Sequence, residues 1–278
     1  MRSRLRAASR ANGARARGRG QLPELRLEER RARRGPGRGV NMVRLPDFSR
    51  RATTREWMDD PTVPDEDVVA ALRDLERINV VLRVRAALAR HLFPRIERAA
   101  RSPVRILDVA TGAADIPRAI VRWARRRGRR VEIVALDLGW PVLRYARRAI
   151  AGYPEIALVR ADARRLPFPR DAFDFVIATE FLHHLADEEI VPFLRHLMGL
   201  ARDAFLINDL RRHPAAYYGF CVLSRLFFRS RLVRHDGPIS ILRGFTVREC
   251  EELRRALGVR AFSLHRHFPY RLLIIGER

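Results

Sequence analysis

Residues 106–117 read ILDVATGAADIP, and this stretch decides the fold class. The apolar run up to Val109 predicts a buried strand, and the small residues after it predict a tight turn into a helix. Asp115 is expected as the helix N-cap, with Pro117 in the first helical turn. In an open α/β sheet, a turn of this kind at the carboxyl end of a strand is where nucleotide-like ligands bind.

The sequence around this stretch repeats the alternation of short apolar segments and helical patterns. Such alternation is typical of βαβ units and a mostly parallel sheet. Strands are predicted at 104–109, 131–137, 156–162, 173–179 and 204–210, and helices at 116–127, 140–151, 187–201 and 247–257. Two further strands, at 259–265 and 270–276, are expected to close the chain as an antiparallel hairpin. We therefore predict an α/β fold with a doubly wound, seven-stranded, mostly parallel sheet.

Further segments are expected to surround the sheet. Apolar stripes between 65 and 98, with a break at Pro94, predict that residues 42–100 form an N-terminal helical cap over the ligand pocket. Residues 101–278 form the predicted α/β domain. Within this domain the connection 211–244 is far longer than an ordinary loop, which predicts a lid insertion over the substrate.

The N-terminal residues 1–41 are rich in arginine and low in complexity, so we predict a disordered tail. Met42 is a candidate translation start, in which case the native protein lacks this tail. The chain has a net charge of +24, and all 56 of its basic residues are arginine. Because arginine without lysine is what a GC-rich genome produces, the charge by itself is weak support for a nucleic-acid partner.

The charges around the 106–117 turn indicate which ligand it binds. A dinucleotide site requires the pattern G-x-G-x-x-G, and here only Gly112 is present. Asp108 and Asp115 would repel a diphosphate, whereas they would attract the ammonium and sulfonium groups of S-adenosylmethionine (SAM). The turn therefore favours SAM over NAD, and a reductase is disfavoured.

Acidic residues also end the next two predicted strands. Asp137 lies 25 positions after Gly112, where a carboxylate grips a ribose diol in nucleotide-binding sheets. Asp162 ends the third strand, where a carboxylate can accept a hydrogen bond from an adenine amino group. Either residue alone is also consistent with helix capping, but acids at three successive strand ends favour a ligand site.

Residues 104–209 resemble the class I SAM-dependent methyltransferases, especially the small-molecule group similar to the ubiquinone and menaquinone biosynthesis enzymes. The first family motif, approximately L-D-[VIL]-G-x-G-x-G, aligns with residues 107–114, where Ala110 and Ala114 replace the first and last glycines. The stretches 166–168 and 173–177 match the approach to the fourth strand. The resemblance and the turn chemistry together assign cofactor binding to Asp108, Ala110, Thr111, Gly112, Asp115, Asp137, Leu138, Asp162, Ala163 and Thr179.

Two adjacent histidines follow the fourth predicted strand. In enzymes of this family the turn passes beside the methionine portion of SAM, and a histidine commonly lies at the position of His184. A histidine there can act as a general base toward an acceptor hydroxyl, or can simply pack beneath the cofactor. His184 is therefore the first catalytic candidate and His183 the second, and no metal site is predicted.

The acceptor is expected to bind beyond the fifth strand, and the candidate substrate-binding residues are Asp209, His213, Tyr217 and Arg243. The aromatic content of 211–244 favours an apolar acceptor, although an aromatic stripe is equally typical of a core. We do not assign a base to the pair His235 and Asp236, because adjacent side chains rarely face each other.

The sequence therefore predicts a SAM-dependent methyltransferase that acts on a small aromatic, quinone or polyketide-like acceptor. The alternatives are an RNA methyltransferase that uses the basic tail as a tether, which the absence of an N/D-P-P-Y-type motif disfavours, and an inactive scaffold. Two cysteines without metal-ligand spacing and no secretory signal favour a cytoplasmic location. No segment is apolar enough to span a bilayer, which leaves peripheral membrane contact open.

Overall fold

A computed structural model describes residues 45–258 and 262–278. Residues 46–278 form one compact unit. The predicted tail at 1–41, and the first residues of the strand predicted at 259–265, lie outside the described residues.

A seven-stranded sheet forms the centre of the fold, with the strand order β3-β2-β1-β4-β5-β7-β6. The first five strands are parallel, and β7 pairs antiparallel with both β5 and β6. The strands are β1 (Val104–Val109), β2 (Val131–Asp137), β3 (Ile156–Arg160), β4 (Phe173–Thr179), β5 (Ala201–Leu210), β6 (Phe262–His267) and β7 (Arg271–Glu277). The doubly wound, mostly parallel sheet predicted from the sequence is confirmed.

Helices cover both faces of this sheet. Successive strand residues point to opposite sides, and in the central strands both sets are buried, so each face packs against helices. Ile106 of β1 packs with α3 (Val84–Arg98) and α4 (Asp115–Arg126). The next residue, Leu107, packs in the opposite core with α6 (Asp187–Leu200) and α9 (Val247–Leu257). A further helix, α5 (Trp140–Ala149), contacts the edge strand β3.

The predicted N-terminal cap divides into two helices with different roles. The helical conformation is interrupted at Leu82 and Arg83, and Arg83 has a left-handed φ of 54°. Helix α2 (Asp65–Val81) therefore ends before these residues, and α3 begins after them. The predicted break at Pro94 is wrong, because α3 continues through Pro94 to bury Ile96 against the sheet. The predicted boundary at residue 100 therefore does not follow the packing, since α3 belongs to the sheet layers.

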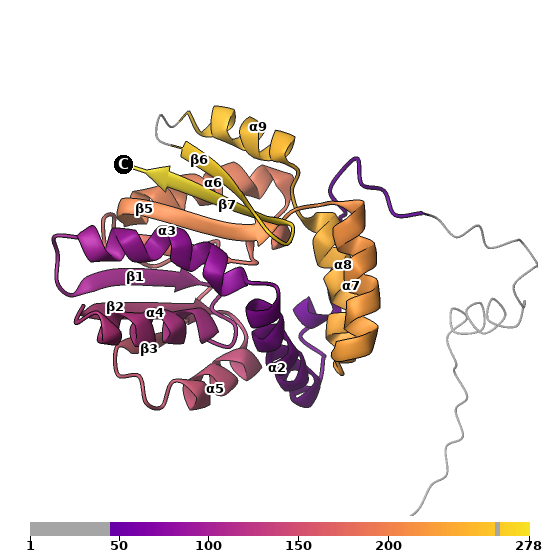
Figure 1. Ribbon diagram of the computed structural model, residues 1–278, viewed down its shortest axis with the longest axis horizontal. Helices are drawn as coiled ribbons and strands as arrows, with labels where there is room; N and C mark the ends of the chain where they lie inside the picture. The colour runs from indigo at the N-terminus through magenta and orange to yellow at the C-terminus, as the bar shows by residue number, and fades with distance from the viewer. Residues whose placement is uncertain (1–44, 259–261) are drawn as a thin grey trace, which may run out of the picture. The chain divides into compact units, whose positions relative to one another are not determined.

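The long connection after β5 folds into α7 (Pro214–Phe227) and α8 (Arg231–Arg243). Figure 1 shows α2, α7 and α8 gathered at the end of the sheet toward which β1 and β5 point. The short 3-10 helices η1 (Trp57–Asp59) and η2 (Leu182–His184) both contact α8. The predicted ligand-binding edge of the sheet is thus bordered by α2 and α8.

Candidate active site

The turn after β1 has the backbone of a glycine-rich loop although it contains one glycine. Ala110, Gly112 and Ala114 have φ values of 56°, 55° and 54°, all in the left-handed region that glycine adopts without strain. These are the three positions at which the family motif has glycine. The alanines preserve the loop conformation at an energetic cost, and nothing lies within 4 Å of the position that a Cβ on Gly112 would occupy.

Three carboxylates gather around this turn. Asp108 is buried and accepts a hydrogen bond of 2.6 Å from the Thr111 hydroxyl. Burial, together with the negative charges of Asp115 and Asp137, raises the pKa of Asp108 to about 7, although the Thr111 hydrogen bond opposes this shift. Burial also raises the pKa of Asp115, although Arg85 lies 3.5 Å away and opposes the rise. The turn is therefore an acidic environment that a cationic ligand would stabilise.

Asp137 links the turn to the end of β2. Its two carboxylate oxygens accept hydrogen bonds from the backbone N–H groups of Gly112, at 3.1 Å, and Gly139, at 3.0 Å. Burial raises its pKa, while these N–H groups and the charge of His184 oppose the rise. Next to it, the apolar side chain of Leu138 is exposed. The fixed carboxylate and the exposed leucine fit the predicted ribose and adenine contacts.

The remaining predicted cofactor residues, Asp162, Ala163 and Thr179, differ in burial and in the hydrogen bonds that they already make. The Asp162 carboxylate already bonds the Arg164 guanidinium at 2.9 Å and the Arg164 N–H, which lowers its pKa, so its predicted adenine contact stays a prediction. Ala163 is buried in the core beneath it. The hydroxyl of Thr179 is buried and has no hydrogen-bond partner among the described residues, and its contact with the cofactor stays a prediction.

Beside this edge, His183 is buried between two carboxylates. Its Nδ1 lies 2.7 Å from Asp209, and its Nε2 lies 3.6 Å from Glu56. Burial alone would lower its pKa, but the charge and hydrogen bond of Asp209 and the proximity of Glu56 raise it to about 10. The two carboxylates thus favour a protonated His183 that is held in place, and His184 stays the first candidate for a base.

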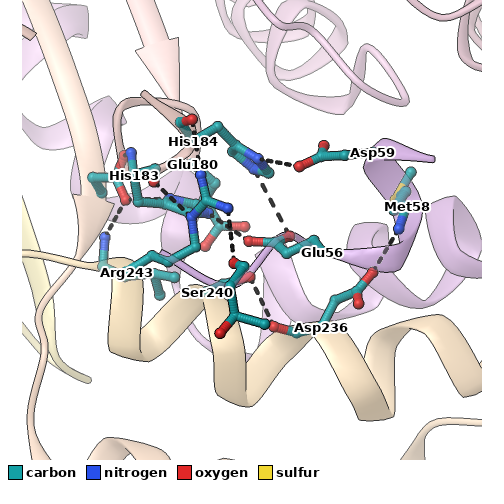
Figure 2. A network of polar contacts seen from close by, with 12 residues as sticks. Glu56, Met58, Asp59, Glu180, His183, His184, Asp236, Ser240 and Arg243 are labelled. Carbon is teal, nitrogen blue, oxygen red and sulfur yellow. Dashed lines mark hydrogen bonds and ion pairs between the residues drawn. The ribbon is translucent and has the colours of Figure 1, made fainter. Parts of the chain in front are cut away.

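His184 is the more accessible of the two histidines. Its Nδ1 lies 3.3 Å from Asp59, and its Nε2 lies 3.9 Å from Glu56. Figure 2 shows Glu56 facing both imidazole rings from the segment that precedes η1. A hydrogen bond donated by Nδ1 to the Asp59 carboxylate leaves the lone pair of the ring on Nε2.

Glu56 is the main residue that the sequence interpretation missed. It is buried, and although burial would raise its pKa, the neighbouring His183 and His184 lower it to about 2. Asp236 of α8 holds the Glu56 segment in place by accepting hydrogen bonds from the N–H groups of Trp57 and Met58 at 2.8 and 2.9 Å. No periodicity marks residue 56, so its pairing with residues 183 and 184 has no signal in the sequence.

The structure also shows that His235 and Asp236, which we expected to point apart, face each other. Their Nδ1 and Oδ1 atoms lie 2.7 Å apart, and the His235 ring stacks on Trp57 at 3.5 Å. Because Asp236 also caps η1, this pair anchors the N-terminal segment to α8.

The four predicted substrate-binding residues separate into two groups. Asp209 is buried and accepts hydrogen bonds from His183 and the Leu210 N–H, and Arg243 donates to the carbonyls of His183, His184 and Thr54. Most of these contacts hold the histidine turn in place, and substrate contact by Asp209 and Arg243 stays a prediction. His213 caps α7, and Tyr217 packs edge-on against Phe48 at 5.7 Å, so substrate contact by this second group stays a prediction.

One group within residues 45–258 and 262–278 has the donor atoms of a metal site. Glu56, His183 and His184 each offer a ligand atom, and these atoms lie within 4.8 Å of one another. A protonated His183 that donates to Asp209 and faces Glu56 has no lone pair for a metal, so the ion-paired arrangement accounts for the cluster. The absence of a metal stays a prediction that chelation can test.

Comparisons with known proteins agree with this geometry. Residues 106–203 match the model of a methyltransferase domain. A SAM-dependent methyltransferase structure from Aquifex aeolicus superposes with a TM-score of 0.54 at 15% identity, covering 75% of this chain and 97% of that one, which shows the shared fold. The chain thus contains a methyltransferase domain, and this match and the shared fold agree with the predicted class I SAM-dependent family and with SAM as its cofactor.

Two relatives with higher sequence identity are demethylmenaquinone methyltransferases. A demethylmenaquinone methyltransferase from Thermus thermophilus is 39% identical over 141 residues, covering 50% of this chain and 61% of the relative. One from Deinococcus radiodurans is 38% identical over 151 residues, covering 52% and 58%. The chain thus spans about three-fifths of the length of these two relatives.

Proposed function

We propose that this protein transfers the methyl group of SAM to a small, lipophilic hydroxyaromatic or quinol acceptor. The observation that carries the proposal is the position of His184, which is partly exposed, held by Asp59 and Glu56, and close enough to Asp137 for its charge to affect that residue. Removal of a proton from the acceptor requires a fixed base near the cofactor, and His184 is an imidazole held near Asp137, the carboxylate predicted to bind the cofactor. The names of the relatives support a quinone-type acceptor.

The protein's own part in the reaction is orientation and proton transfer. SAM supplies a methyl group that is already activated by the sulfonium, so the protein must align the acceptor and exclude water. His184 Nε2 removes the acceptor's hydroxyl proton, and the electron pair released to the acceptor forms its new bond to the methyl carbon, directly at oxygen or through the ring carbon. The sulfur–methyl bond breaks and leaves a neutral thioether. His183, Glu56 and Arg243 hold the imidazole in place for this step.

Methyl transfer from labelled SAM tests the proposal. The assay compares demethylmenaquinone reduced to its quinol with a panel of simple hydroxyaromatic compounds. We expect His184→Gln to reduce kcat by about 10²–10⁴-fold while leaving SAM affinity unchanged. The matched control is His196→Gln, an exposed histidine of α6, which should retain wild-type turnover. Wild-type kcat in the His184 variant would rule out its role as the base.

A further inference from the structure

Helix α7 has an exposed apolar face. Its opposite side packs Phe220 against α8 and the segment around α2. The exposed side chains are Tyr218 (49%), Val222 (59%), Leu223 (39%), Leu226 (69%) and Phe227 (66%). Residues 218, 222 and 226 are four positions apart, so they lie along one side of the helix. The part of the chain that the structure describes leaves this face uncovered.

The segment of sequence that contains this face carries charges of one sign only. Between residues 211 and 235 the sequence contains six arginines and no aspartate or glutamate. Arg231 pairs with Asp67 at 2.6 Å. Within the described residues, the side chains of Arg225, Arg229 and Arg234 form no ion pair with a carboxylate. Arg225 lies on α7 three positions from Val222, and Arg229 and Arg234 follow in the next segment, so these cationic groups can meet an anionic surface next to the apolar face.

We propose that α7 docks on an anionic lipid surface, with its apolar face at the boundary between headgroups and acyl chains. An apolar helix face bordered by arginine is the pattern of helices that lie in the membrane interface. None of the described helices is long and apolar enough to cross a membrane. A second copy of the chain fits this face less well, because a two-fold contact would bring the same arginines together.

Docking at this face would place the active site close to the lipid. Helix α7 packs on α8, and α8 contacts both η1 and η2, which contain Asp59, His183 and His184. An acceptor dissolved in the membrane would therefore have only a short distance to travel from the lipid at α7, past α8, to the site. This argument rests on the proposed function, since it requires a lipophilic acceptor.

Co-sedimentation of the full chain with vesicles tests the docking. We expect binding to vesicles of phosphatidylcholine and phosphatidylglycerol that weakens with salt, and much weaker binding to phosphatidylcholine alone. Val222→Ser combined with Leu226→Ser should reduce the vesicle partition coefficient by about tenfold or more. The control is Val81→Ser, which removes an apolar side chain of α2 that is 67% exposed. Unchanged SAM affinity in the double variant shows that it is folded.

Two results would overturn the inference. One is equal partition of the wild type and the double variant. The other is a dimer in light scattering that the double variant dissociates, which would assign the face to a second copy. Turnover of an acceptor dissolved in detergent separates this inference from the proposed function. If docking fails while that turnover persists, only the inference falls, and if docking holds without turnover, the proposed function falls.

Discussion

The buried ion-pair network around His183 gives the most quantitative prediction. Asp209→Asn keeps the shape of the side chain but removes the charge that faces the His183 imidazolium at 2.7 Å. The Leu210 N–H, which donates to the Asp209 carboxylate at 2.7 Å, then faces a side-chain amide instead. Because the buried imidazolium then keeps only Glu56, 3.6 Å away, as a counter-charge, we expect the free energy of unfolding to fall by about 3 kcal/mol near pH 6.

The pH dependence of this loss follows from the shifted pKa values. His183 has a folded pKa of about 10, raised from 6.5, so its contribution to stability is full below pH 6.5 and is lost as the pH rises toward 10. Asp209 has a folded pKa of about 2, lowered from 3.8, so its contribution is present above pH 3.8 and is lost as the pH falls through 2. The difference in the free energy of unfolding between wild type and variant is therefore largest between about pH 3.8 and pH 6.5, and it is smaller at pH 10.

Urea unfolding at pH 6 and pH 10 measures the effect. The control is Asp171→Asn, which breaks an exposed ion pair with Arg278 and should cost less than about 1 kcal/mol at either pH. A loss below 1 kcal/mol for Asp209→Asn, or an equal loss at both pH values, would refute the argument that His183 is a buried cation. An NMR titration that finds the His183 pKa near its ordinary value would refute it as well.

Three further predictions concern the cofactor turn and the polar cluster. Ala110→Gly should stabilise the fold by about 0.5–1 kcal/mol in thermal unfolding, because relief of the left-handed strain exceeds the added chain entropy, whereas Ala119→Gly in α4 should destabilise it by about 1 kcal/mol. SAM affinity measured by calorimetry should rise roughly tenfold between about pH 6 and 8, since a cationic ligand favours ionised Asp108, whose pKa is about 7, and a flat profile would contradict this. Dialysis against EDTA should leave turnover unchanged, and a loss that Zn²⁺ or Mg²⁺ restores would instead assign a metal to Glu56, His183 and His184.

The sheet was largely predictable because its strands are continuous apolar runs that end at polar turns. The predicted limits of β1, β2 and β4 agree with the structure at both ends. The acids at the strand ends followed from topology alone, since the carboxyl ends of parallel strands meet at one edge of the sheet. The ends of β3 and β5 were displaced by two and three residues, where pairing with a neighbouring strand sets the boundary.

The polar network was less predictable because side-chain direction and long-range pairing leave no local pattern. Glu56 reaches its partners across more than a hundred residues, from a segment without periodicity. Asp209 ends a strand, as a substrate ligand would, but its side chain turns inward to His183. Arg243 was predicted to meet the substrate, yet it donates to backbone carbonyls that exist only once α8 and η2 are packed.

The central claim, that this is a working SAM-dependent site, is tested most directly by isothermal titration calorimetry of the full chain. The ligands are SAM, S-adenosylhomocysteine and NADH, with Asp137→Ala as the matched variant. We predict saturable one-to-one binding of the two sulfur ligands, no binding of NADH, and loss of SAM binding in a variant that stays folded. A folded wild-type protein that binds neither sulfur ligand, or an Asp137 variant with unchanged affinity, would contradict it.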